Sequence, residues 1–303
     1  MAPSVASSPA GNLTADRAKK AQGTFAAPRA LGLWHLASLD APTVAVVWTL
    51  GFAWAGHVRA PVRMLVLEAL VTWSVYVADR LLDAKRGLRD PSKQRLRERH
   101  FFHWRHRRAL LPLAIAAGCA AAGIVAALTA PEARATDSVL GAAALAYFSG
   151  VHSARRSLLG QWPRSFPGKE FLVGLLFTAG CALAAWDGTG RLAAWTFWIP
   201  AIGFAALAWL NCASIARWES KDASRSPRAF ALALAALELV LSMFAAVREP
   251  RSAALLAAAG LSALLLALLD RLRTRMTPLE LRSAADVVLL TPALMMISSW
   301  VLG

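Results

Sequence analysis

The sequence predicts an all-α protein that crosses the membrane several times. Hydrophobic residues make up 57% of its 303 residues, and its mean hydropathy is +0.47. Only 17% of the residues are charged, and these are gathered into short clusters between long apolar runs. Soluble domains carry less apolar sequence, whereas apolar runs separated by charged loops are typical of membrane-spanning helices. The runs are continuous rather than alternating, which argues against membrane-spanning strands.

The chain divides into a tail and one transmembrane domain. Residues 1–30 are rich in Ala, Ser, Pro and Gly and contain no apolar run, so they are predicted to form a flexible cytoplasmic tail. Residues 31–303 are predicted to form a single transmembrane helical domain, whose first span is capped by Asp40. Each predicted span is near the roughly 20 apolar residues that a crossing needs. The nine spans are residues 42–55, 62–83, 109–128, 138–153, 171–185, 195–216, 229–247, 253–269 and 284–302.

Basic residues are distributed as a nine-span topology requires. Of the 33 lysines and arginines, 26 fall in the tail and the loops after even-numbered spans, six fall in the loops after odd-numbered spans, and Arg80 lies within span two. Basic loops face the cytoplasm, so the N-terminus is predicted to be cytoplasmic and the C-terminus to lie outside, in an integral protein of the cell inner membrane. The formal net charge of +15 is then explained by topology and anionic lipid, and no nucleic-acid partner is expected.

Several residues inside the apolar runs are predicted to face the protein interior. Cys119, Cys181 and Cys212 have no metal-ligand spacing and are interpreted as small core residues. Glu238 lies in the middle of span seven, where an acid is expected to avoid lipid and pack inside.

Span two carries a polar stripe that ends in two aspartates. Glu68, Thr72, Tyr76, Asp79 and Asp83 recur at spacings of three or four residues, which places them on one helix face. Carboxylates at this depth are expected to face the bundle or a wet cavity. Two aspartates four residues apart can share a cation such as Mg²⁺. The alternative is that both are rim residues neutralised by nearby cations, among them Arg80, Lys85 and Arg86.

The loop after span two is the most basic part of the chain. Residues 85–108 contain ten lysines and arginines, which could hold a phosphorylated group or could simply fix the topology. His100, His103 and His106 recur every third residue. Because their surroundings are so basic, they are interpreted as interfacial residues rather than metal ligands.

A second acidic cluster follows span six, on the same predicted side of the membrane. Asn211, Ser214, Trp218 and Asp222 share a helix face, with Glu219 beside it. The alternative is a helix end with local ion pairs. Lys169 opens span five and either contacts a phosphate or snorkels to the interface. Arg282 and Asp286 are predicted to form an i, i+4 ion pair.

Together these features resemble the UbiA superfamily of intramembrane prenyltransferases. That family has nine transmembrane helices around a cytoplasm-facing cavity, with aspartate-rich motifs closing helices two and six. Its first motif, N-D-x-x-D-x-x-x-D, is matched here by Asp79 and Asp83, while Val75 and Tyr76 stand where it has Asn-Asp. In the second region, Asn211, Ile215 and Glu219 occupy the four-residue spacing, with Asp222 just beyond. The resemblance covers most of the chain after the tail.

The resemblance implies a function and a set of site residues. It implies transfer of an isoprenyl group from a prenyl diphosphate to an aromatic or other lipid-precursor acceptor. It implies Mg²⁺ as cofactor, bound by Asp79, Asp83 and Glu219. Asp79, Asp83 and Lys169 would be the catalytic residues, with Lys169 stabilising the departing diphosphate. The substrate-binding residues would be Tyr76, Arg86, Lys169, Asn211 and Asp222.

Two other functions stay open. The incomplete first motif is also consistent with a non-catalytic UbiA-like protein that binds a polyprenyl phosphate or another lipid. A transporter is a third interpretation, based on Glu68 and Glu238 within the spans. The sequence lacks paired Gly- or Pro-broken helices in matching halves, which argues against transport.

Overall fold

The computed structural model describes residues 29–89, 96–152, 168–186, 195–219 and 227–302, and this part of the chain is helical with no strand. Each of the nine predicted spans overlaps with helical structure in the described residues. The helices, in chain order, are α2 (Arg29–Leu36), α3 (Asp40–Ala55), α4 (Val62–Arg89), α5 (Glu98–Arg105), α6 (Arg107–Leu128), α7 (Pro131–His152), α8 (Gly168–Trp186), α9 (Trp195–Glu219), α10 (Arg228–Ala245), α11 (Pro250–Leu272), α12 (Pro278–Val287) and α13 (Thr291–Leu302), with short 3₁₀ turns at Arg273–Arg275 and Val288–Leu290.

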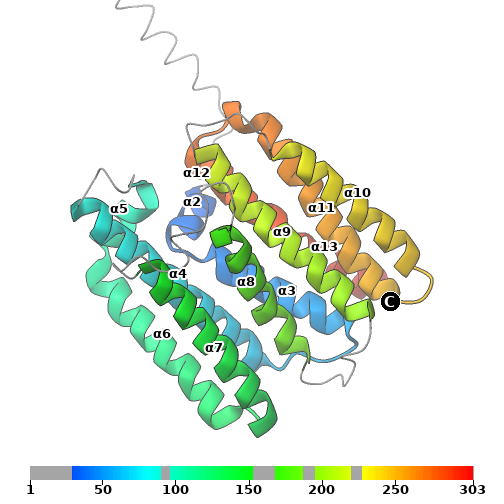
Figure 1. Ribbon diagram of the computed structural model, residues 1–303, viewed down its shortest axis with the longest axis horizontal. Helices are drawn as coiled ribbons and strands as arrows, with labels where there is room; N and C mark the ends of the chain where they lie inside the picture. Colours follow the sequence, from blue (N-terminus) through cyan, green and yellow to red (C-terminus); the bar gives the residue numbers. More distant parts are fainter. Residues whose placement is uncertain (1–28, 90–95, 153–167, 187–194, 220–226, 303) are drawn as a thin grey trace, which may run out of the picture.

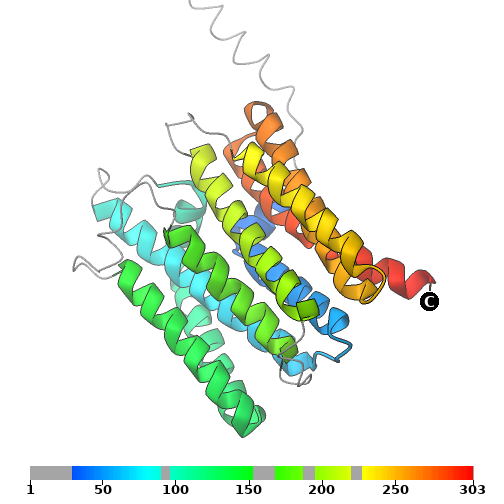
Figure 2. The ribbon, with the colours of Figure 1, turned by 45° about the vertical axis from the view of Figure 1, so that its right-hand side comes forward.

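The long helices form a broad bundle. The two views agree that α4, α6 and α7 lie on one side, α10 and α11 on the other, and α3, α8 and α9 between them (Figure 1, Figure 2). Helices joined by short connections, such as α10 and α11, pack against each other. The short helices α2, α5 and α12 lie near one end of the bundle (Figure 1), and this end holds the candidate site.

The main core lies on the α3, α9 and α11 side of the molecule. Trp48 on α3 stacks on Phe204 on α9, with ring centroids 3.9 Å apart. Its indole N–H donates to the carbonyl of Leu289 at 2.9 Å, which anchors the 3₁₀ turn after α12. Gly174 on α8 lets α9 approach closely, because a Cβ there would lie 2.8 Å from the backbone nitrogen of Trp209. Aromatic packing and close backbone contact therefore hold the centre rigid.

Among the described residues, four helices are long and apolar enough to cross a membrane: Arg107–Leu128, Phe197–Glu219, Arg228–Ala245 and Pro250–Arg275. A fifth crossing results if α2 and α3, which meet at 88°, count as one broken span. Their outward faces carry large apolar side chains, including Ile115 on α6 and Phe244 on α10, which are 59% and 76% exposed. These helices indicate an integral membrane protein. The all-helical prediction is confirmed, and the count of nine crossings stays a prediction.

The predicted ninth span is interrupted. The α-helix stops at Val287, and α13 begins at Thr291. The Ser262 hydroxyl on α11 donates to the Val288 carbonyl at 2.7 Å, and the Thr291 hydroxyl donates to the Ala258 carbonyl at 2.8 Å. Polar groups of α11 therefore hold the break, which sequence periodicity did not reveal.

The bend between α2 and α3 has a local cause. Ser38 adopts a φ of 56°, in the left-handed region that residues other than glycine rarely occupy. Its side chain is buried, and its hydroxyl lies 3.2 Å from Nε2 of His103 on α5. Asp40 is the first residue of α3 rather than its cap, which is Leu39.

The interior residues follow the prediction only in part. Cys181 is buried and Cys212 is half-buried, but Cys119 is exposed on α6. The prediction of a core position is therefore wrong for Cys119, because α6 turns that face away from the bundle. Glu238 is 1% exposed, which confirms its interior position.

Candidate functional site

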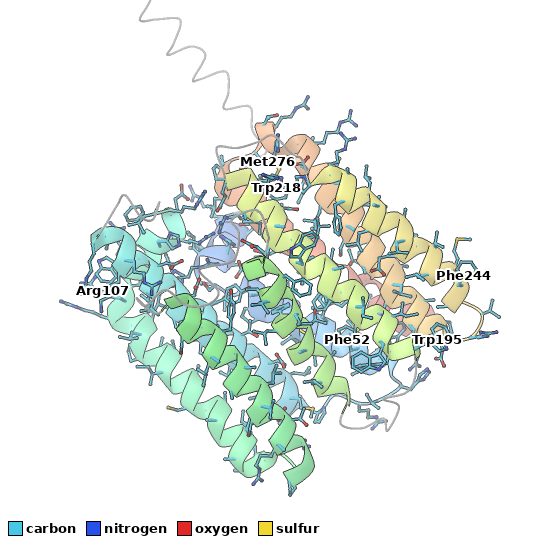
Figure 3. The ribbon with its side chains drawn as sticks, in the orientation of Figure 1. Phe52, Arg107, Trp195, Trp218, Phe244 and Met276 are labelled. Atoms are coloured by element: carbon cyan, nitrogen blue, oxygen red, sulfur yellow. The ribbon has the colours of Figure 1, made fainter. Side chains whose placement is uncertain are left out.

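A cavity of about 590 Å³ lies at the end of the bundle where α9 and α11 finish. The labelled side chains of Trp218 and Met276 lie side by side there, far from Phe52 and Trp195 (Figure 3). The wall is strongly cationic and partly apolar. It contains five arginines, Arg97, Arg99, Arg217, Arg273 and Arg282, and two glutamates, Glu98 and Glu219, together with Ile215, Trp218, Met276 and Leu279. We call this space the arginine cavity.

Glu219, the last residue of α9, ties the cavity wall together. Its Oε1 lies 3.1 Å from Nη1 of Arg97, and it also forms an ion pair with Arg282 on α12. The Glu219 carbonyl accepts a second hydrogen bond from Arg97 at 3.5 Å, so the cation meets the negative end of the helix dipole. Glu219 thus positions two arginines, and its metal-ligand role stays a prediction.

The polar stripe of α4 faces the interior, as predicted. Thr72 is buried, and Tyr76, Asp79 and Asp83 are half-buried. At the start of the stripe, Glu68 faces α8, where a Cβ on Gly180 would lie 3.2 Å from the Glu68 carboxylate. The interior orientation is therefore general along this face of α4.

The two motif aspartates lie outside the arginine cavity, Asp79 beside an arginine and Asp83 beside a histidine. The side chain of Asp79 is 33% exposed, and its Oδ2 lies 4.0 Å from Nη1 of Arg80. The guanidinium of Arg80 also lies over the ring of Tyr76, 5.6 Å from its centroid. Asp83 lies 4.0 Å from Nε2 of His100. Arg99 is within electrostatic reach of both Asp79 and Glu219, so it connects the two acidic helix ends.

Much of the basic segment is helical rather than a loop. Its first residues continue α4 to Arg89, and after residues 90–95, which lie outside the described part, α5 runs from Glu98 to Arg105. Arg86, in the last turn of α4, is half-buried. Burial lowers the pKa of Arg99 to about 9, which still leaves it cationic at neutral pH.

Two of the three histidines in this segment are structural. The interfacial prediction is wrong for His100 and His103, which are 3% and 0% exposed, because α5 folds back against α2 and α4. Nδ1 of His103 donates to the Arg99 carbonyl at 2.8 Å, and Nδ1 of His100 accepts from the Arg97 amide at 3.0 Å. Burial and then the charge of Arg99 lower the pKa of His100 to about 3. Burial also lowers the pKa of His103 to about 4, so both are neutral at pH 7.

The remaining predicted site residues have different outcomes. Lys169 lies in the first turn of α8, and its side-chain contacts are outside the described part of the structure, as is the whole of Asp222. Asn211 on α9 is 6% exposed, and its Nδ2 donates to Oδ1 of Asp286 at 3.3 Å. The predicted pair between Arg282 and Asp286 is wrong, since α12 directs Arg282 to Glu219 and Asp286 to Asn211 and His35.

Sequence reasoning missed His35 and the second role of Asp40. His35 on α2 lines the arginine cavity and contacts Asp40 and Asp286. Asp40 was interpreted only as a helix cap, because its partner lies beyond a sharp bend that periodicity does not predict. An aspartate beside a long apolar run was the available signal.

Comparisons with known proteins find no counterpart: no family model, no curated protein and no solved structure matches this chain. The chemistry of the arginine cavity and the adjacent acidic helix ends is therefore the basis for assigning a function.

Proposed function

We propose that this chain is a membrane prenyltransferase, which transfers an isoprenyl group from a prenyl diphosphate to an aromatic or other lipid-precursor acceptor. One observation carries the proposal: a cavity lined by five arginines at the end of an apolar helix bundle. The nine-crossing, UbiA-like topology belongs to the same proposal, with the cavity on the cytoplasmic side. The position of the basic loops supports that side.

The cavity has the chemistry of a diphosphate site. Guanidinium groups bind phosphate oxygens through paired hydrogen bonds, and five of them face two glutamates here. The ion pairs of Glu219 hold Arg97 and Arg282 in place before any ligand arrives. Fixed cations stabilise the negative charge that develops on a departing diphosphate. Lys169 and Arg86 are proposed to add to this charge.

The apolar part of the wall suits the rest of the substrate. Ile215, Trp218, Met276 and Leu279 line the same space and could contact the first isoprene units. Tyr76, Asn211 and Asp222 are proposed to contact the acceptor or the donor from the α4 and α9 sides. This arrangement places a charged head group and an apolar chain in neighbouring surroundings.

Mg²⁺ is the proposed cofactor, with the carboxylates of α4 as its proposed ligands. Asp79 and Asp83 lie one turn apart, and their side chains are 33% and 20% exposed, so both are accessible to an ion. Carboxylates together with phosphate oxygens are the ligands that Mg²⁺ prefers. Bound there, with Glu219 as the proposed third ligand, Mg²⁺ would neutralise charge on the diphosphate.

One observation favours a second function, a non-catalytic protein that binds a polyprenyl phosphate or other lipid. Neither Asp79 nor Asp83 lines the arginine cavity, and Glu219 is already neutralised by two arginines. A phosphate could therefore bind through arginines alone, without Mg²⁺ and without prenyl transfer.

A transfer assay separates the two functions. Purified protein is incubated with radiolabelled prenyl diphosphates, Mg²⁺ and a membrane extract containing quinone precursors. Prenyl transfer predicts a labelled lipid product that disappears with EDTA and in Asp79→Ala. Diphosphate binding without any product would favour the lipid-binding function.

A matched pair of arginine variants locates the binding site. Arg97→Gln removes a cavity cation and is expected to weaken diphosphate binding about tenfold, the loss of one or two charge-assisted hydrogen bonds. Arg107→Gln is the control, because Arg107 lies on the far side of the bundle (Figure 3) and stacks on Trp104, 4.6 Å from its ring centroid. Equal binding by both variants would contradict the assignment of the cavity.

A further inference from the structure

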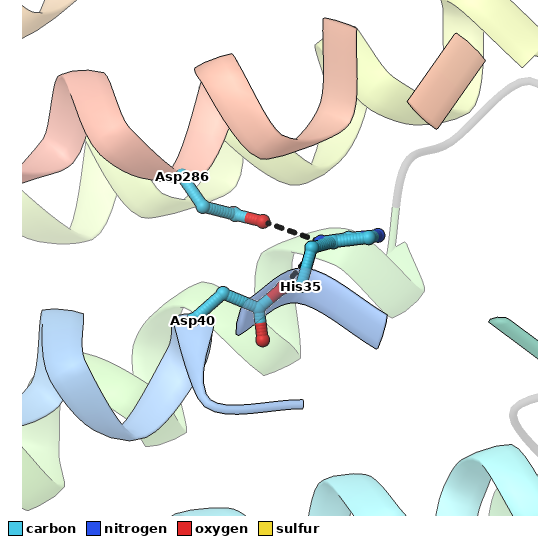
Figure 4. Close-up of side chains that lie close together, drawn as sticks. All are labelled: His35, Asp40 and Asp286. Atoms are coloured by element: carbon cyan, nitrogen blue, oxygen red, sulfur yellow. Dashed lines mark ion pairs between the residues drawn. The ribbon is translucent and has the colours of Figure 1, made fainter. Parts of the chain in front are cut away.

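Three side chains from separate helices meet beside the arginine cavity (Figure 4). His35 comes from α2, Asp40 from α3 and Asp286 from α12. Nδ1 of His35 lies 2.6 Å from Oδ2 of Asp40 and 3.5 Å from Oδ2 of Asp286. One potential ligand atom from each residue lies within 4.8 Å of the other two. This arrangement could hold a metal ion through three ligands, two of them five residues apart and the third, Asp286, distant in the sequence.

The group is buried and contains two carboxylates. The side chains of His35 and Asp40 are each 3% exposed, and that of Asp286 is 16% exposed. Two carboxylates in such a place require a cation, which is either a protonated His35 or a bound ion, because an uncompensated buried charge is costly. Arg282, on the same helix as Asp286, is committed to Glu219, so it does not fill that role.

Polar atoms around the group lack partners. Nε2 of His35 is buried and has no hydrogen-bond partner in the described part of the chain, whereas Nδ1 of the same ring contacts the two carboxylates. Oδ1 of Asn211 is also buried and unpartnered, while the Nδ2 of the same side chain donates to Asp286. Native proteins rarely leave buried polar atoms unsatisfied, and here they occur beside two carboxylates. This second observation points to a bound ligand rather than to packing.

The donor set indicates the kind of ion. One imidazole nitrogen and two carboxylate oxygens suit Zn²⁺, Fe²⁺ or Mn²⁺, whereas Mg²⁺ prefers oxygen ligands alone. Ligands bound at about 2.0–2.2 Å are held roughly 3 Å apart, and the two distances from His35 fall on either side of that value. Oδ1 of Asp40 accepts from the Ala41 amide at 2.9 Å, which orients this carboxylate as the supporting hydrogen bonds of metal sites do.

We propose that His35, Asp40 and Asp286 bind one divalent transition-metal ion of the Zn²⁺ or Mn²⁺ kind. The site is separate from the Mg²⁺ site proposed at Asp79 and Asp83, and it does not depend on prenyl transfer. It joins α2, α3 and α12 at the edge of the arginine cavity. The alternative for the same geometry is a proton shared between His35 and the two carboxylates, with no metal.

Metal binding by the full chain tests the proposal. Protein without a polyhistidine tag is stripped with EDTA in detergent and titrated with Zn²⁺ or Mn²⁺ by calorimetry, with metal content measured after dialysis. Wild type and Asp79→Asn/Asp83→Asn are expected to bind one equivalent at this site. Asp286→Asn and His35→Gln should bind at least about tenfold more weakly. Zn²⁺ should also raise the Tm of the wild type and not that of Asp286→Asn.

Two results would overturn the site. One is the absence of binding to wild type, which assigns the shared proton instead. The other is a wrong pattern among the variants. Binding that survives both His35→Gln and Asp286→Asn, or binding that is lost in Asp79→Asn/Asp83→Asn, would place the ion elsewhere. X-ray absorption of Zn²⁺-loaded wild type needs no variant: one imidazole with oxygen ligands supports the site, and oxygen ligands alone exclude it.

Discussion

Glu219 and Glu238 are two acids in apolar helices, and the structure treats them in opposite ways. Glu219 ends α9 and is held by Arg97 and Arg282 at the wall of the arginine cavity. Glu238 lies inside α10, is 1% exposed, and its Oε2 has no hydrogen-bond partner within the described residues. Glu219 therefore positions two arginines, whereas Glu238 is packed in the interior without a cation among the described residues.

The space for Glu238 is provided by glycines on the neighbouring helices. A Cβ on Gly203 of α9 would collide with the Glu238 carboxyl, and one on Gly260 of α11 would lie 3.3 Å from the Cβ of Glu238. Close packing therefore fixes Glu238, whereas electrostatics fix Glu219. An acid in a membrane helix is usually a candidate for a functional residue. The comparison shows that the neighbouring side chains determine whether such an acid belongs to a site or to the packed interior.

The largest effect is expected for Glu219→Gln. Removing the carboxylate leaves Arg97 and Arg282 without their partner, and Arg282 is only 8% exposed. Breaking a buried ion pair from one side costs about 3–5 kcal/mol, and partial exposure of Glu219 reduces this to about 2–4 kcal/mol. The free energy of unfolding in detergent measures the loss. An unchanged value would show that the pairs contribute nothing to the cavity wall.

Gly203→Ala should destabilise the bundle by about 1–3 kcal/mol, the usual cost of overpacking. The new methyl group would collide with the Glu238 carboxyl, and because Glu238 is 1% exposed its side chain would have to shift within a packed interior. The control is Gly118→Ala on α6, where nothing lies within 4 Å of the new Cβ, so the substitution is expected to be neutral or stabilising. Rescue of Gly203→Ala by Glu238→Ala, seen as a restored Tm, would confirm the collision.

Acid should weaken the polar end of the bundle. The pKa of His103 is lowered to about 4 in the folded protein, against about 6.5 when unfolded. Between these pH values the imidazole of His103 binds a proton in the unfolded chain but not in the folded protein. The contribution of His103 to the free energy of unfolding is therefore fully present above about pH 6.5 and is lost as the pH drops towards 4. For this one imidazole, the free energy of unfolding falls by about 1.4 kcal/mol per pH unit.

The histidine prediction is checked by unfolding at pH 6.5, 5.5 and 4.5. His103→Gln should reduce the slope, and His106→Gln, at an exposed position, should leave it unchanged. A steeper slope in His103→Gln than in wild type would contradict the assignment of a neutral, buried imidazole.

Glu238→Gln should have the smallest effect, within about 1 kcal/mol. The amide has nearly the same size, and the structure shows no ion pair for Glu238 among the described residues. The paired measurement with Glu219→Gln is the sharpest form of the comparison. Similar losses in unfolding free energy for both variants would mean that Glu238 also carries a charge with a partner.

The sequence predicted the helices well and the contacts between distant helices poorly. Apolar runs define where α6, α10 and α11 lie, because hydrocarbon requires about 20 apolar residues. The interior face of α4 was also predictable, since Thr72, Tyr76 and Asp79 recur with helical spacing. The break between α12 and α13 was not, because the bonds that hold it come from Ser262 on another helix.

The candidate site was only partly predictable for the same reason. Loop charge predicted that the acidic helix ends lie near the basic segment, and Arg99 in that segment interacts electrostatically with Asp79 and Glu219. The partners of Arg282 and Asp286 depend on how α12 is rotated against α9 and α2, which local spacing cannot determine. His35 and Asp40 are five residues apart, but they meet because of the bend at Ser38.

The 88° bend before α3 has a consequence for hydrogen–deuterium exchange. If α3 stands along the bilayer normal, α2 lies flat across the end of the bundle, with Leu33 58% exposed on one side and His35 4% exposed on the other. A short helix held mainly by its buried side should open more easily than the long helices beneath it. Amide exchange in Arg29–Leu36 is therefore expected to slow when an ion binds His35, which makes this helix a local reporter of occupancy that needs no knowledge of the reaction.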